Sequence, residues 1–98
     1  MSDRDAADFR KLDELMQKDE ILFRVGIGHL LSVGYANLTD EAVEKTIEEI
    51  EAEALSEESE LQVISPVYQV AILRMAAKIR EVPLWTLLKY ISRKVNIS

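Results

Sequence analysis

Apolar residues recur at helical spacing along most of this chain, and that periodicity limits the fold more than any other feature of the sequence. One stripe, at positions i, i+4, i+7 and i+11, consists of Val43, Ile47, Ile50 and Ala54. A second stripe, near the C-terminus, consists of Leu84, Leu87, Leu88, Ile91 and Val95. Charged residues separate the apolar ones, which is the pattern of helices that bury one face. The sequence therefore predicts an all-α protein.

Start and stop signals divide the chain into about five helices. Asp19 and Thr39 are suitable N-caps, and Gly34 can end a helix because it accepts a left-handed backbone conformation. Pro66 and Pro83 favour helix starts, since proline fixes φ near the helical value. The predicted helices cover 3–18, 20–33, a third segment from 40 to a break at 56–59, 66–80, and a last segment from 83 onward. A short helical turn around Leu61 and Ile64 is a further expectation.

Length and composition predict one domain, residues 1–98, folded as a single small bundle. The chain has 98 residues, of which 48% are hydrophobic, and this is enough apolar surface for one core but too few residues for two domains. Segment 20–33 is apolar around most of its circumference, so we expect it to be central. We also expect neighbouring helices to cover most of segment 66–80.

The sequence favours a cytoplasmic location without membrane association. Cysteine is absent, so no disulfide requires an oxidising compartment. The N-terminus is polar and acidic, unlike a signal peptide, and no apolar run approaches the ~20 residues that cross a bilayer.

Nothing in the sequence indicates an enzyme, a metal site or a cofactor. His29 is the single histidine, and with no cysteine it cannot form a multi-ligand metal site, so we expect it to be structural. The many glutamates lie on the solvent side of a predicted helix, where catalytic carboxylates rarely occur. Gly26 and Gly28 lack the third glycine of a nucleotide-binding loop, and instead favour close helix approach or a bend.

Charge is distributed unevenly between the two ends of the chain. Residues 1–62 carry 17 acids and 6 bases, whereas residues 63–98 carry 6 bases and one acid, Glu81. A basic end of this kind can bind nucleic acid or an acidic partner. The alternative is that the two ends attract each other within the fold.

The last helix carries the surface that we predict to bind a partner. If its leucine stripe faces inward, aromatic and cationic side chains occupy the flank and outer face, a composition typical of binding hot spots. The predicted partner-binding residues are Trp85, Thr86, Lys89, Tyr90, Arg93 and Lys94. In the alternative interpretation Trp85 folds back over the core and the bases pair with glutamates of the third helix.

Two functions are consistent with this pattern. The first is a non-enzymatic helical interaction module, an accessory or regulatory subunit that docks on a larger protein assembly or self-associates through its C-terminal helix. The alternative is a DNA-binding transcriptional regulator whose last two helices form a helix-turn-helix. In that motif Ala76 or Ala77 would lie at the helix contact, Val82 in the turn and Leu87 in the core, although Glu81 in the turn would repel phosphate.

Overall fold

The computed structural model describes residues 3–55 and 65–94. Within these residues the chain forms five helices and no strand, which confirms the predicted all-α class. The expected break at 56–59, the turn around Leu61 and Ile64, and the tail from Val95 lie outside the described residues. The helices are α1 (Asp3–Lys18), α2 (Glu20–Val33), α3 (Asp40–Ala54), α4 (Pro66–Arg80) and α5 (Leu84–Lys94).

Local capping bonds explain where α2 and α3 begin and where α2 ends. The Asp19 side chain accepts a hydrogen bond from the Leu22 amide at 3.0 Å, and Thr39 accepts one from the Ala42 amide at 3.1 Å. At the end of α2, Gly34 has φ of +100°, and its N–H donates to the Leu30 carbonyl at 2.8 Å. These bonds satisfy backbone groups that a helix leaves unpaired at its ends. The cap and stop residues predicted from the sequence are confirmed.

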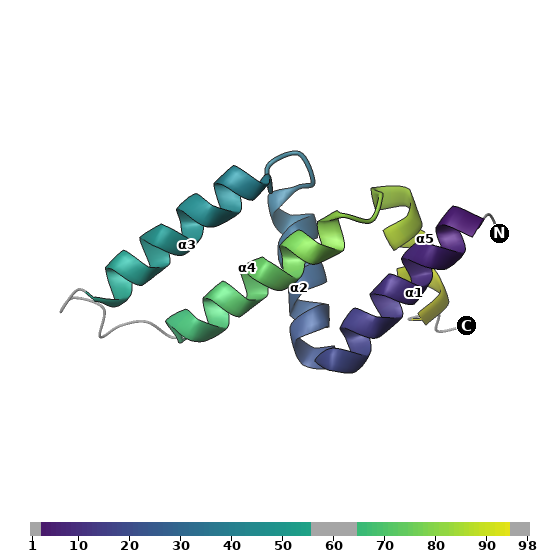
Figure 1. Ribbon diagram of the computed structural model, residues 1–98, viewed down its shortest axis with the longest axis horizontal. Coiled ribbons are helices and arrows are strands. Elements are labelled where there is room, and N and C mark those ends of the chain that lie inside the picture. The colour runs from purple at the N-terminus through teal and green to yellow at the C-terminus, as the bar shows by residue number, and fades with distance from the viewer. Residues whose placement is uncertain (1–2, 56–64, 95–98) are drawn as a thin grey trace.

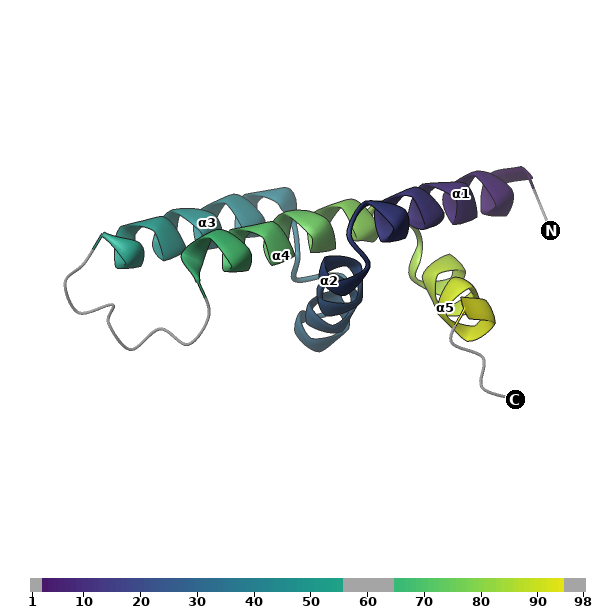
Figure 2. The same cartoon turned by 90° about the horizontal axis from the view of Figure 1, so that it is seen from below.

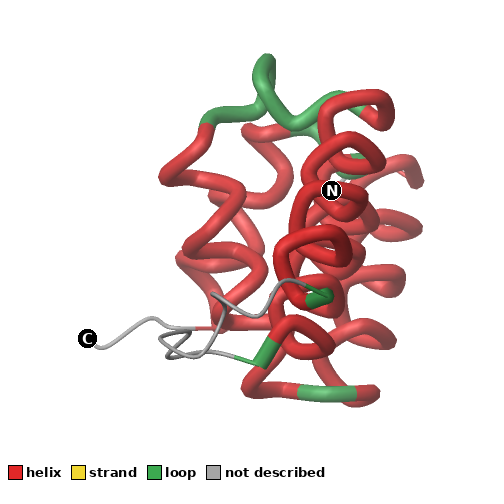
Figure 3. The backbone as a smooth tube through the Cα atoms, turned by 90° about the vertical axis from the view of Figure 1, so that its left-hand side faces the viewer, coloured by secondary structure: helices red, strands yellow, loops and turns green. Residues whose placement is uncertain are grey.

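The helices lie in two layers. α3, α4 and α1 form one layer, and α2 and α5 lie together on one side of it (Figures 1 and 2). Figure 3 shows the same two layers from the end of the molecule. α3 and α4 run antiparallel as a hairpin that extends away from α1 and α5, which accounts for an elongated shape of 51 × 28 × 21 Å.

α2 packs against α4 in the core, and this contact requires a small residue at position 26. A Cβ on Gly26 would lie 2.9 Å from Cγ of Met75, closer than side-chain atoms pack. The expectation that a small residue lets another helix approach is therefore confirmed at Gly26. Gly28 is different, because a Cβ there would meet nothing within 4 Å.

Burial along the helices departs from the sequence pattern in two places. α2 buries Phe23, Gly26 and Leu30 on one side only, so Ile21 on the opposite side is 70% exposed. α4 is covered over its C-terminal part, but Val67 near its start is 80% exposed. Both departures follow from the two-layer arrangement, in which α2 has neighbours on one side and α3 and α4 extend together away from the other helices. On α3 the predicted stripe is buried at Val43 and Ile47, half-buried at Ile50 and exposed at Ala54.

We predict opposite effects for alanine at the two glycines of α2. Gly26→Ala should lower the free energy of unfolding by about 1 kcal/mol, because overpacking against Met75 exceeds the gain in helix propensity. Gly28→Ala should raise it by up to about 1 kcal/mol, since the new methyl group meets only solvent. Urea unfolding followed by circular dichroism at low micromolar concentration measures both. Equal effects at the two positions would contradict the packing described for Gly26.

Candidate docking surface on the C-terminal helix

Tyr90 fixes the orientation of α5. Its side chain is 1% exposed, and its hydroxyl donates a hydrogen bond to the Asp13 carboxylate of α1 at 2.7 Å. Its ring packs edge-to-face against Phe9 of α1 and Phe23 of α2, with centroid separations of 5.5 and 6.1 Å. Such aromatic pairs contribute beyond the area that they bury. One residue thus joins α5 to both of its neighbouring helices.

The predicted outward placement of Thr86 and Tyr90 is wrong. Thr86 is 6% exposed, and its hydroxyl lies 3.4 Å from an Asp5 carboxylate oxygen. The helix is rotated by about 100°, one residue's turn, relative to an orientation that would bury all the leucines. Leu84 and Leu88, expected to face inward, are consequently 37% and 38% exposed. The physical reason is that Asp5 and Asp13 of α1 satisfy polar groups of α5 that the sequence pattern assigns to solvent.

An apolar strip on the outer side of α5, the Trp85 ridge, consists of Leu84, Trp85 and Leu88. Trp85 is 76% exposed, so its predicted outward placement is confirmed, and the indole does not fold back over the core. The ridge borders a shallow hollow of about 380 Å³, lined by Trp85, Leu88, Lys89, Ser92 and Arg93. Leu84 and Leu88 are the members that the sequence analysis missed, because their spacing is that of core residues.

The cations of α5 are engaged by α1. Lys89 lies 3.7 Å from a carboxylate oxygen of Asp5, and Lys94 lies 3.3 Å from one of Asp13. The Arg93 guanidinium lies over the Phe9 ring, 5.2 Å from its centroid, in cation–π geometry. Lys89 and Lys94 of α5 therefore do contact acidic residues within the fold, but those residues belong to α1 and not to α3.

Of the residues assigned to the helix-turn-helix, Ala77 is half-buried and the other three are buried. Ala76, Val82 and Leu87 are each 0% exposed. The Val82 carbonyl accepts a hydrogen bond from the Tyr35 hydroxyl at 3.2 Å, and Arg80 Nε donates to the Tyr35 carbonyl at 2.7 Å. These bonds hold the link between α4 and α5 against the loop that follows α2, while α5 itself packs on α1.

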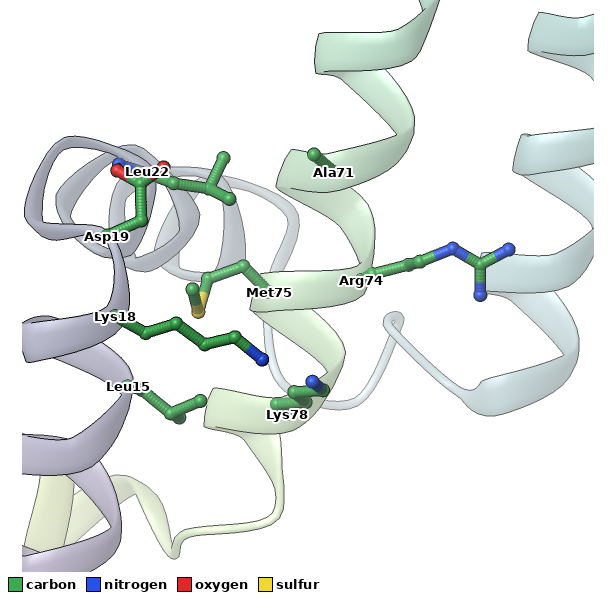
Figure 4. A pocket seen from close by; sticks show the side chains of 8 residues that line it. All are labelled: Leu15, Lys18, Asp19, Leu22, Ala71, Arg74, Met75 and Lys78. Carbon is green, nitrogen blue, oxygen red and sulfur yellow. The ribbon is translucent and has the colours of Figure 1, made fainter.

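A second hollow, of about 360 Å³, lies where the end of α1 and the start of α2 meet α4. Figure 4 shows the Lys18 side chain extending into it, whereas Arg74 points away from it toward α3. Its one acid, Asp19, already accepts the capping hydrogen bond from Leu22. The rest of the lining consists of the apolar residues Leu15, Leu22, Ala71 and Met75 and the cations Lys18, Arg74 and Lys78.

Other predicted features can be located among the described residues. His29 is half-buried on α2. No cluster of three or more metal-binding side chains occurs in this part of the chain. None of the described helices combines the length and the apolar character needed to cross a membrane.

No protein-family model, curated protein or solved structure matches the sequence.

We predict that the buried Tyr90 and the half-buried Tyr35 make the fold sensitive to alkali. Burial, reinforced by the hydrogen bond to Asp13 and by the charge of that carboxylate, raises the pKa of Tyr90 well above its usual value. Burial also raises the pKa of Tyr35 to about 12, although the Arg80 charge opposes this. In the unfolded chain both phenols lose their protons near pH ~10. Their contribution to stability is therefore complete below pH ~10 and is lost as pH rises toward and beyond 12.

Urea unfolding at a series of alkaline pH values measures this loss. The free energy of unfolding should fall above pH ~10, and Tyr90→Phe should make that fall shallower because phenylalanine does not ionise. The difference between this variant and the unmodified protein gives the effect of Tyr90 ionisation on the free energy of unfolding, because the lysines are the same in both. The same slope in Tyr90→Phe and in the unmodified protein would contradict the assignment.

We predict that the tryptophan fluorescence of this protein, excited where tyrosine does not absorb, reports on the Trp85 ridge alone, because Trp85 is its single tryptophan. The emission should be that of a water-exposed indole, readily quenched by acrylamide, and urea unfolding should shift its wavelength little. A strong red shift on unfolding would instead mean that the indole is enclosed in the folded protein.

Proposed function

We propose that this protein is a non-enzymatic helical interaction module, an accessory or regulatory subunit that docks on a protein partner through the Trp85 ridge. The observation that carries the proposal is the 76% exposure of Trp85 on a helix whose opposite side is tightly anchored. Tryptophan is enriched at binding hot spots because it supplies a large contact area with few rotatable bonds.

The anchoring of α5 supports this proposal because it reduces the entropic cost of binding. Tyr90 and Leu87 are buried at 1% and 0% exposure, so the helix backbone behind the ridge is already ordered before a partner arrives. A preorganised surface loses less conformational freedom on association than a flexible one. Lys89 and Arg93 at the edge of the ridge form the polar rim that protein interfaces commonly have.

DNA binding is the weaker alternative. The burial of Ala76, Val82 and Leu87 fits a helix-turn-helix, but the outer side of α5 presents an indole and two leucines where recognition helices usually carry polar groups. Carboxylates of α1 also lie next to the α5 cations and would repel phosphate. To bind DNA, Lys89 and Lys94 would have to leave Asp5 and Asp13 and contact phosphate groups instead.

The experiment is affinity capture on the immobilised chain, with and without nuclease, followed by titration of the purified partner. Trp85→Ala should weaken binding by about 30-fold, or ~2 kcal/mol, the cost typical of removing a hot-spot side chain. Binding should depend only weakly on salt. The matched control is Leu55→Ala, which removes an 89% exposed leucine at the far end of the α3–α4 hairpin and should leave affinity unchanged.

Other outcomes separate the alternatives. Binding that nuclease removes, that falls steeply with salt and that is lost in a Lys89→Glu, Arg93→Glu double variant would indicate DNA, because phosphate contacts release counterions. If Leu55→Ala weakens binding and Trp85→Ala does not, the docking surface lies around Leu55 at the end of α3 and the proposal is wrong.

A further inference from the structure

Gly28 has no role in the packing of this chain. It lies in the middle of α2, where glycine lowers helix stability by about 1 kcal/mol relative to alanine. Gly26 has a reason to be glycine, namely the contact with Met75, but a Cβ at position 28 would meet nothing within 4 Å. A helix glycine that the fold does not need is explained if another backbone approaches it from outside the chain.

Gly28 lies within an uncovered stripe on the outer side of α2, opposite the side that packs on α4. Residues 21, 25, 28 and 32 follow one another at i, i+4, i+7 and i+11, so they share one face of the helix. Ile21 is 70% exposed and Val25 39% exposed, while Ser32 and Gly28 are small and exposed. This outer stripe thus has two large apolar residues toward its N-terminal end and two small residues toward its C-terminal end.

We propose that the outer stripe binds the same stripe of a second copy of this chain, with the two α2 helices antiparallel. In this arrangement a twofold axis passes between the two α2 helices at the height of the peptide bond between Gly26 and Ile27. Each residue before that bond in one copy then faces the residue equally far after it in the other copy. Val25 of one copy then faces Gly28 of the other. Ile21 faces Ser32 at each end.

This pairing places every large residue of the stripe opposite a small one, and the twofold axis repeats the match on both sides. Self-complementarity of this kind is what an interface between two identical surfaces requires. A parallel arrangement in register would set Val25 against Val25 and Gly28 against Gly28, which leaves one contact crowded and the other empty. The order of large and small residues therefore fits an antiparallel second copy better than a parallel one in register.

Charge also permits two copies to meet at α2. The chain has a net charge of −6, so most of its surface repels a second copy. α3 contributes seven acids and one base to this charge. α2 carries one acid and one base, Glu20 and Arg24, which pair with each other at 3.1 Å. The outer stripe is therefore a neutral surface on an acidic protein.

The expected association is weak. A single pair of helices buries less than the ~1,200 Å² of a standard interface, and contacts of that size are usually transient. Sedimentation equilibrium from a few micromolar to about 1 mM should detect a reversible dimer in this range. The unmodified protein should dimerise, and Gly28→Ala should weaken the dimer at least tenfold although it does not disturb the monomer fold.

A matched pair of variants controls for added charge. Val25→Asp should abolish the dimer, and Val67→Asp, which places the same charge at an 80% exposed site on α4, should retain it. Circular dichroism checks that each variant is folded. A protein that stays monomeric to about 1 mM, or a dimer that persists in Gly28→Ala and Val25→Asp, overturns the proposal.

Disulfide trapping tests the register, since the chain has no cysteine of its own. A mixture of Val25→Cys and Gly28→Cys proteins should cross-link as a heterodimer, because opposed residues fall within disulfide reach. A mixture of Val25→Cys and Ser32→Cys should not, since about one helical turn separates them in this register. Efficient cross-linking of Val25→Cys with itself alone would indicate a parallel pair and overturn the arrangement.

Partner docking is measured separately with Trp85→Ala, so failure of the dimer leaves the proposed function standing.

Discussion

The burial of Tyr90 between α1 and α2 determines which side of α5 faces solvent. Its hydroxyl needs a hydrogen-bond partner once it is removed from water, and Asp13 supplies one at 2.7 Å. Phe9 and Phe23 surround the ring. Because a helix turns as a rigid unit, burying this side of α5 forces Trp85 outward, and the proposed docking surface is a consequence of that one internal contact.

The acidic residues of α1 and those of α3 have different roles. Those of α1 neutralise α5, through Asp5 with Lys89 and Asp13 with Lys94. Those of α3 have no such partner on α5, and they are exposed to solvent. The acids of α1 thus attract the basic helix α5 within the fold, whereas the acids of α3 face water.

The two layers leave α2 and α5 uncovered on the same side of the molecule. α2 approaches α4 closely because Gly26 allows it, and this contact directs the opposite face of α2, with Ile21, Val25 and Gly28, to solvent. The two glycines of α2 are two residues apart and therefore on different faces. Only Gly26 is needed for the packing of this chain. Gly28 is not, and this is the basis of the proposed contact with a second copy.

The sequence by itself determined the helices, because their signals are local. Capping residues such as Asp19 and Thr39, the stop at Gly34 and the proline at the start of α4 act over a few neighbouring residues, and each boundary they predicted is found. The exposure of Trp85 was also predicted. The rotation of α5 was not, because it depends on carboxylates of α1 more than seventy residues earlier in the chain. Only the tertiary structure decided that Thr86 and Tyr90 face inward, since helical spacing identifies a face but cannot tell which polar groups will find partners when that face is buried.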